Sequence, residues 1–220
     1  MTLARSPALT VLVVLALGAG AALAQSGGRI GNLNDPVPPS VPGLLVGNQV
    51  FAYLVMPDEQ VACPDGGFIL QTVAMTLDFT AEQVPATITV NAGLLDAHLE
   101  DNGFYVPGGE IGTSPEITVT IDAPGLHVIP VPLQGACGCE PTDAPYFLSF
   151  RYLGPAVANL AIDDQPAPGI VYLDSGNGYV DMYELGKTSG GKVIIWGDIV
   201  CCIAVGAEPT TWQDVKSLFR

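Results

Sequence analysis

Short apolar runs alternate with clusters of turn residues along most of the chain, which is the spacing of an all-β protein. In the clearest run, residues 116–122 (EITVTID) alternate isoleucine or valine with threonine, as in a half-buried antiparallel sheet. The strands predicted in this way cover residues 49–56, 68–78, 87–91, 116–122, 126–133, 146–152 and 192–203. We therefore predict an all-β antiparallel β-sandwich, jelly-roll-like, in which Pro130 and Pro132 place the strand at 126–133 toward a sheet edge.

The two ends of the chain lack this alternation. Residues 25–47 are rich in Gly, Pro, Asn and Ser and show no apolar period, which predicts an extended leader or linker before a sandwich domain at 48–205. Residues 206–220 end in TTWQDVKSLFR, whose apolar residues recur at helical spacing, so a short C-terminal helix is expected. Because so short a helix is unstable alone, it packs either on its own sandwich or on an external partner.

The first 24 residues have the pattern of a secretory signal peptide. Arg5 provides a positive start, residues 8–17 an apolar stretch, and Ala22-Leu23-Ala24 a small-x-small cleavage site. The apolar stretch is shorter than the roughly 20 residues of a membrane-spanning helix. We therefore expect a secreted protein, extracellular or periplasmic, with no transmembrane segment after signal cleavage.

The composition agrees with strands and turns and narrows the range of partners. Of the 220 residues, 26 are Gly and 19 are Pro, and only 13% are charged, against about 25% in an average domain. Seven Lys or Arg stand against 22 Asp or Glu, for a formal net charge of −15. A nucleic-acid partner needs clustered cations to contact phosphates, so the charge excludes that class.

All five cysteines follow the signal segment, and in an exported protein they are expected to form disulfides: Cys63, Cys137, Cys139, Cys201 and Cys202. Neighbouring residues of a strand face opposite sides, so Cys201 and Cys202 should reach different partners. We predict at least one bridge from this pair to Cys137 or Cys139. A zinc site made by the same residues is the alternative, although C-x-C and C-C lack the two-residue gap usual in zinc knuckles.

Candidate catalytic chemistry is sparse. There is no G-x-S-x-G motif, and the two histidines, His98 and His127, lie near a turn and in a strand pattern. The many acids leave open the paired carboxylates of a glycoside hydrolase, because spacing in sequence says nothing about distance in space. We therefore keep an exported hydrolase as a third functional hypothesis, after the two that close this subsection.

Residues 161–184 (AIDDQPAPGIVYLDSGNGYVDMYE) carry the most suggestive chemistry. Oxygen ligands on irregular backbone are what Ca²⁺ requires, and the candidate ligands are Asp163, Asp164, Asp174, Asn177 and Asp181. Turn formation is the alternative role for these residues, whose spacing is not that of an EF-hand loop. Three aromatic residues of the same segment form either a sugar-binding face or a cover over the core edge: Tyr172, Tyr179 and Tyr183.

The C-terminal third combines, in order, Asp163-Asp164, the loop YLDSGNGYVD, the strand VIIWGD, Cys201-Cys202 and the tail TTWQDVKSLFR. This order, together with the C-x-C element at 137–139, resembles a group of uncharacterised secreted bacterial proteins. The resemblance carries no activity over to this chain. Similar chains have a Cys just before the tyrosine loop, where this chain has Ile170 and Val171, and the departure leaves one thiol without an obvious partner.

Together these patterns favour a secreted, non-enzymatic binding or structural protein of the cell exterior or envelope. The alternative is a carbohydrate-binding module that uses the tyrosine segment, with Ca²⁺ as a candidate cofactor. The partner is then a surface or a carbohydrate, and unpaired strand edges leave self-association open.

Overall fold

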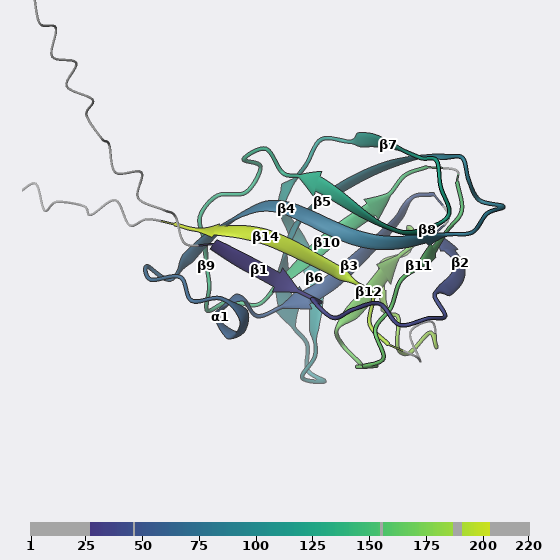
Figure 1. Cartoon of the computed structure of the whole chain (residues 1–220). Coiled ribbons are helices and arrows are strands. Elements are labelled where there is room, and N and C mark those ends of the chain that lie inside the picture. The colour runs from purple at the N-terminus through teal and green to yellow at the C-terminus, as the bar shows by residue number, and fades with distance from the viewer. Residues whose placement is uncertain (1–26, 46, 155, 187–190, 203–220) are drawn as a thin grey trace, which may run out of the picture.

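The structure, a computed structural model, describes residues 27–45, 47–154, 156–186 and 191–202. Two antiparallel sheets of seven strands each lie face to face around one main core (Figure 1). The predicted all-β antiparallel sandwich is therefore confirmed. The signal segment and the C-terminal helix predicted at 206–220 lie outside the described residues. Within the part described, no helix is long and apolar enough to cross a membrane.

The first sheet, which we call sheet A, is built around its longest strand, β4. Strands β14 and β11 follow one another along one side of β4, and β1 and β2 pair with them; β8 and β9 pair along the opposite side. The strands are β1 (Gly27–Gly31), β2 (Val41–Leu45), β4 (Gly67–Phe79), β8 (Gly125–Pro132), β9 (Glu140–Pro141), β11 (Ala158–Leu160) and β14 (Ile195–Cys201).

The second sheet, sheet B, has the order β13-β12-β3-β10-β5, and both β6 and β7 pair with the outer side of β5. Its strands are β3 (Gln49–Val55), β5 (Ala86–Leu99), β6 (Tyr105–Thr113), β7 (Ile117–Ile121), β10 (Tyr146–Tyr152), β12 (Val171–Asp174) and β13 (Tyr179–Asp181). A single helical turn, α1 (Pro57–Gln60), follows β3. The chain passes between the sheets repeatedly, so neighbouring strands come from distant parts of the sequence.

The core consists of the inward-facing side chains of both sheets. Phe51 and Phe150 are directly opposite each other on β3 and β10, and both are fully or almost fully buried. Tyr152 is buried as well, and its hydroxyl donates to the carbonyl of Ala156 at 2.7 Å, so its polar end keeps a partner. The aromatic and β-branched residues that predicted these strands therefore fill the space between the sheets.

The N-terminal segment is part of the sandwich, which corrects the expectation of a leader or linker up to residue 47. β1 pairs along its whole length with β14, β2 pairs with β11, and Ile30 and Leu45 are fully buried. Glycines take the place of apolar side chains in β1, and at Gly27 the reason is close backbone approach: a Cβ there would lie 2.6 Å from the carbonyl oxygen of Ile199. Backbone pairing, rather than a hydrophobic stripe, places this strand.

Two disulfides lie at the end of β14. Cys201 is bonded to Cys63 and Cys202 to Cys139, so the two adjacent cysteines reach different partners and one of them reaches the C-x-C element, as predicted. The two bridges therefore consume three of the four thiols considered for zinc, Cys139, Cys201 and Cys202. In the chain-entropy picture, loops of 63 and 138 residues each constrain the unfolded chain by roughly 4 to 5 kcal/mol. The thiol left over is Cys137, which is buried.

We expect Cys137 to stay unreactive in the native protein. Burial, with a smaller contribution from nearby Glu140, raises the pKa of its thiol to about 11, so the reactive thiolate is scarce at neutral pH. A maleimide should label one thiol per chain only after unfolding in denaturant without reductant, as mass spectrometry of intact protein would show. Cys137→Ser, the matched control, should remove that label and keep both bridges in non-reducing peptide maps. Rapid labelling of native protein, or three labelled thiols, would contradict the assignment.

Candidate functional site

Asp163 is the most buried of the acids singled out in the sequence, at 1% exposure. Its Oδ1 accepts hydrogen bonds from the backbone N–H groups of Lys192 at 2.7 Å and Gln165 at 3.0 Å. Its Oδ2 accepts from the side-chain amides of Asn34 at 2.8 Å and Asn32 at 3.1 Å. The ammonium group of Lys192 lies 3.8 Å from Oδ2. Both oxygens therefore serve protein donors, and the carboxylate joins three separate segments of the chain.

The charged form of this carboxylate is favoured by its surroundings. Burial by itself raises the pKa of Asp163, but the hydrogen bonds from Lys192, Asn34, Gln165 and Asn32 outweigh burial and lower the pKa below its ordinary value. The close approach also depends on a glycine, because a Cβ at residue 191 would overlap the carbonyl group of Asp163. Asp163 is thus a built structural centre of the fold.

The other candidate cation ligands do not gather around Asp163. Asp174 accepts from backbone N–H groups of the glycine-rich turn that follows it. Asp181 accepts hydrogen bonds from the N–H of Gly169 at 2.7 Å and from the N–H of Tyr183. Asp164 and Asn177 are exposed. In the described part of the chain, no group of three or more His, Cys, Asp or Glu could hold a metal ion, and Ca²⁺ stays a prediction.

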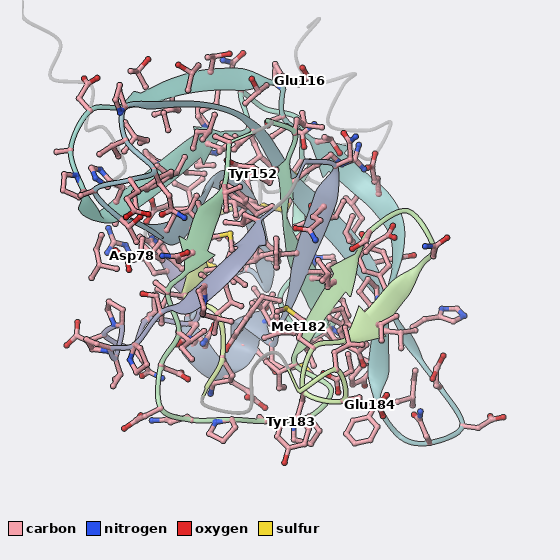
Figure 2. The ribbon with its side chains drawn as sticks, turned by 90° about the vertical axis from the view of Figure 1, so that its right-hand side faces the viewer. Asp78, Glu116, Tyr152, Met182, Tyr183 and Glu184 are labelled. Carbon is pink, nitrogen blue, oxygen red and sulfur yellow. A yellow bond between two sulfur atoms is a disulfide. The ribbon has the colours of Figure 1, made fainter. Side chains whose placement is uncertain are left out.

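The structure also separates the three tyrosines. Tyr172 is 5% exposed and packs edge-on against Phe147, with ring centroids 5.5 Å apart, in a small apolar cluster on the outer face of sheet B. Tyr179 is partly buried against this cluster, whereas Tyr183 is exposed and lies outside it, at one end of the molecule (Figure 2). Burial raises the pKa of Tyr172 to about 12. Tyr172 and Tyr179 therefore cover apolar strand surface, and the three rings form no common binding face.

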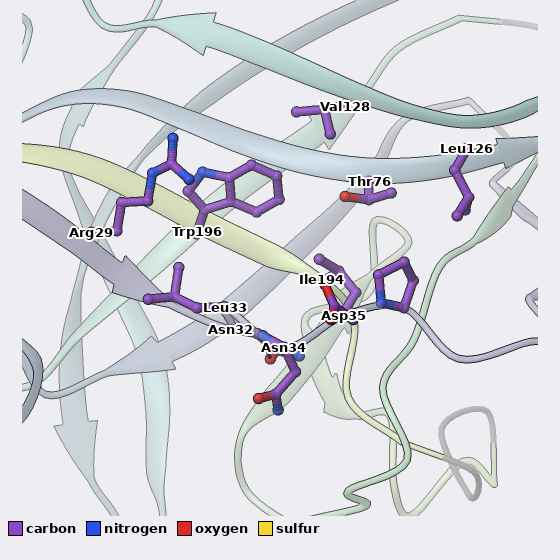
Figure 3. Close-up of a pocket in the computed structure, with 11 residues that line it drawn as sticks. Arg29, Asn32, Leu33, Asn34, Asp35, Thr76, Leu126, Val128, Ile194 and Trp196 are labelled. Carbon is purple, nitrogen blue, oxygen red and sulfur yellow. Dashed lines mark hydrogen bonds between the residues drawn. The ribbon is translucent and has the colours of Figure 1, made fainter.

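A hollow of about 410 Å³ lies instead on the outer face of sheet A (Figure 3). Three neighbouring strands contribute to it with side chains that point away from the core: β14 with Trp196, β4 with Thr76, and β8 with Val128. We call this hollow the sheet A groove. Its lining residues are Arg29, Asn32, Leu33, Asn34, Asp35, Pro36, Thr76, Leu126, Val128, Ile194 and Trp196.

Trp196 and Arg29 form one end of the groove. The Arg29 guanidinium lies 5.9 Å from the centre of the Trp196 ring and donates to Asp198 at 2.9 Å, and Figure 3 shows the two side chains next to each other on adjacent strands. The ion pair is exposed and contributes little to stability. It does hold the guanidinium beside the indole, so this end of the groove combines an aromatic surface with a charged donor.

The chain turns at Gly31 from β1 into one wall of the groove. Gly31 has a φ of +113°, and a Cβ there would lie 2.6 Å from the carbonyl oxygen of Ile195, so the position requires glycine. The side chain of Gln60 accepts from the N–H of Gly31 at 2.7 Å and donates to its carbonyl at 3.0 Å. The wall, residues 32–36, is then held by the side-chain amides of Asn32 and Asn34, which donate to Asp163.

The opposite wall is apolar and exposed. Leu126 and Val128 of β8 are each 52% exposed, and Leu33 of the facing wall is 53% exposed. The polar groups between them are Asn34, Asp35 and the hydroxyl of Thr76. None of the described residues that line the groove is a His, Cys or Ser. The arrangement is suited to reversible binding through apolar contact and hydrogen bonds.

Comparisons with known proteins give few relatives. No protein-family model matches the chain, and no curated protein matches it. One similar solved structure contains the cysteine protease and lectin-like domains of Cwp84, a surface layer associated protein of Clostridium difficile; its TM-score is 0.46 at 12% identity over 70% of this chain and 33% of the other. A second structure, clostridial cysteine protease Cwp84 after propeptide cleavage, has a TM-score of 0.47 at 12% identity over 73% and 38%.

This chain therefore spans 33% of the length of the first structure and 38% of the second. Neither similarity is high enough to carry a conclusion about activity or ligand.

Replacing Asp163 by Asn should destabilise the protein by roughly 2 to 4 kcal/mol at pH 7, because hydrogen bonds to a buried charge contribute about 1.5 to 3 kcal/mol each and Asn cannot accept all of them. A carboxylate with a lowered pKa stabilises the fold above its unfolded pKa of about 4, and this stability is lost as the pH falls through the folded pKa. The difference between wild type and Asp163→Asn should therefore shrink in acid. Urea unfolding at pH 7 and pH 3 measures it.

Asp164→Asn is the matched control, since Asp164 is adjacent and exposed. It should leave the free energy of unfolding within about 0.5 kcal/mol of wild type. Equal effects of the two substitutions at pH 7 would show that Asp163 is not a structural centre.

Proposed function

We propose that this protein is an exported, non-enzymatic binding protein that holds a carbohydrate in the sheet A groove. The observation that supports the proposal is the outward-facing Trp196, flanked by Arg29 and by the polar wall at Asn34 and Asp35. The two disulfides agree with export, because such bonds persist in oxidising compartments.

A carbohydrate matches the chemistry of this groove. A pyranose ring has apolar C–H faces and a rim of hydroxyl groups, so it is held by an aromatic or aliphatic surface together with side chains that both donate and accept hydrogen bonds. Trp196 and Val128 supply the first, and the amide of Asn34, the carboxylate of Asp35 and the Thr76 hydroxyl supply the second. The arrangement of these groups within one hollow favours a small, polar, ring-shaped ligand unit.

The charge of the chain argues against other classes of partner. The formal net charge is −15, which repels nucleic acid and anionic lipid surfaces alike. The described residues that line the groove include one cation, Arg29, and it is already paired with Asp198. The negative charge of a phosphate-bearing ligand would therefore find no free cation among these residues.

Parts of two strands at the edges of sheet A are closed to pairing with another strand. Just after β8 the N–H of Leu133 donates to the carbonyl of Gln71 within the sheet. The alternate positions 130 and 132 therefore direct their backbone nitrogens away from the sheet. Both are prolines, which have no N–H to donate to another strand. At β1 the side chain of Gln60 occupies the outward backbone groups of Gly31. These two features favour a binding role over a structural one.

We expect Trp196→Ala to weaken carbohydrate binding by about tenfold or more, because it removes the aromatic surface of the groove. The measurement is affinity gel electrophoresis of the secreted protein in gels that contain hydroxyethylcellulose, laminarin, xylan, soluble starch, glycol chitin or polygalacturonate. The sequence has two tryptophans, so a Trp212→Phe background leaves Trp196 as a fluorescence reporter for the same titrations.

The matched control is Tyr183→Ala, which removes an exposed aromatic residue of the segment that the sequence favoured. It should bind like the unmodified protein. Thermal unfolding of each variant separates lost binding from lost folding. Migration unaffected by every polysaccharide of the panel would overturn the proposal, and loss of binding in Tyr183→Ala with retention in Trp196→Ala would move the site back to residues 161–184.

A further inference from the structure

The sheet A groove does not end at Leu126. A second hollow of about 370 Å³ continues beyond it and shares Pro36 and Leu126 with the first. Its lining includes Ser40, Asp78 and Asn159 as polar groups, with proline residues of the 36–39 segment along one side. The two hollows therefore form one elongated groove between the chain that follows β1 and the edge strand β8.

The length of this groove follows from the register of the sheet. Trp196 lies opposite Ala74 on β4, and Asn159 lies opposite Asp78 on the same strand. Four residues of extended strand span roughly 14 Å, which is about the length of three pyranose rings in a linear chain. A single sugar unit would thus contact one end of the groove and leave the other end empty.

The charges along the groove restrict the kind of sugar. Asp35 lines the first half and Asp78 the second, whereas the one cation among the described lining residues, Arg29, is 2.9 Å from Asp198. Added carboxylate or sulfate groups on a ligand would meet these acids without a free cation to compensate them. Hydroxyl and acetamido groups can instead donate to the carboxylates.

We infer that the groove binds a linear glycan without acidic groups, in an extended conformation, along at least three consecutive sugar units. This inference rests on the proposed carbohydrate-binding function and adds the ligand class to it. Trp196 holds one unit at the first half of the groove. Ser40 and Asp78 contact the units at the second half.

The experiment is isothermal titration calorimetry of the secreted protein with oligomers of one to six units. The probes are cello-oligosaccharides and N-acetylated chito-oligosaccharides, together with oligomers cut from whichever neutral polysaccharide of the gel panel retards the protein. Oligogalacturonates of equal length are the acidic probes. The Kd should fall at least tenfold between two and four units and then level off, and the acidic oligomers should bind at least tenfold more weakly than neutral ones of the same length.

Variants of the two halves locate the effect. Trp196→Ala should weaken binding of every length, whereas Asp78→Ala should leave disaccharide binding within twofold and reduce the gain from two to four units to threefold or less. Ser40→Ala is a milder change in the same half and should also reduce the gain in affinity from two to four units. It replaces Asp78→Ala as the test if that variant does not fold.

Three results would overturn the inference: a Kd that is already constant from the disaccharide onward, a gain with length that survives both variants of the second half, or tighter binding of oligogalacturonates. Each of them leaves the proposed function standing if binding still depends on Trp196. Absence of binding to the whole panel instead removes the proposed function itself.

Discussion

The buried carboxylate of Asp163 is the interaction on which the candidate site depends. Its hydrogen bonds connect Asn32 and Asn34, which follow β1, with Lys192, which precedes β14. Such a group is stabilising only while all its donors are in place, since an unpaired buried charge is costly. The requirement holds the wall of the groove in one position against the sheet, and a wall made of irregular backbone is thereby tied to the core.

The groove itself follows from the outer face of sheet A. The inner positions of β4 and β14 are filled by apolar residues of the core, so the alternate positions are free to carry chemistry, and there the chain places Thr76, Asp78 and Trp196. Disulfides at Cys201 and Cys202 anchor the far end of β14. A strand fixed by covalent bonds at one end and by the Asp163 network near the other is a stable base for a binding site.

The structure does not bring the candidate residues of 161–184 together, for a reason that composition could not reveal. Aspartates and tyrosines in residues 161–184 have the composition of a ligand site, but composition does not show that Tyr172 packs against Phe147 or that Asp174 holds its own turn. A usable signal existed in β14, where Ile195, Trp196 and Gly197 alternate, so that one large aromatic faces away from the core. The polar wall beyond Gly31 carried no signal, because its residues are typical of any loop.

By itself the sequence determined the fold class and the chemistry of the cysteines. The period-two alternation specifies antiparallel strands, and the adjacency of Cys201 and Cys202 on a strand forces them toward different partners. Only the tertiary structure decided that β1 and β2 belong to the sandwich, since they pair through backbone groups that every residue has. The tertiary structure also decided the groove. Asn32 contacts Asp163, which lies 131 positions away in the sequence, and Arg29 contacts Asp198, which lies 169 positions away. No local pattern encodes which distant segments meet.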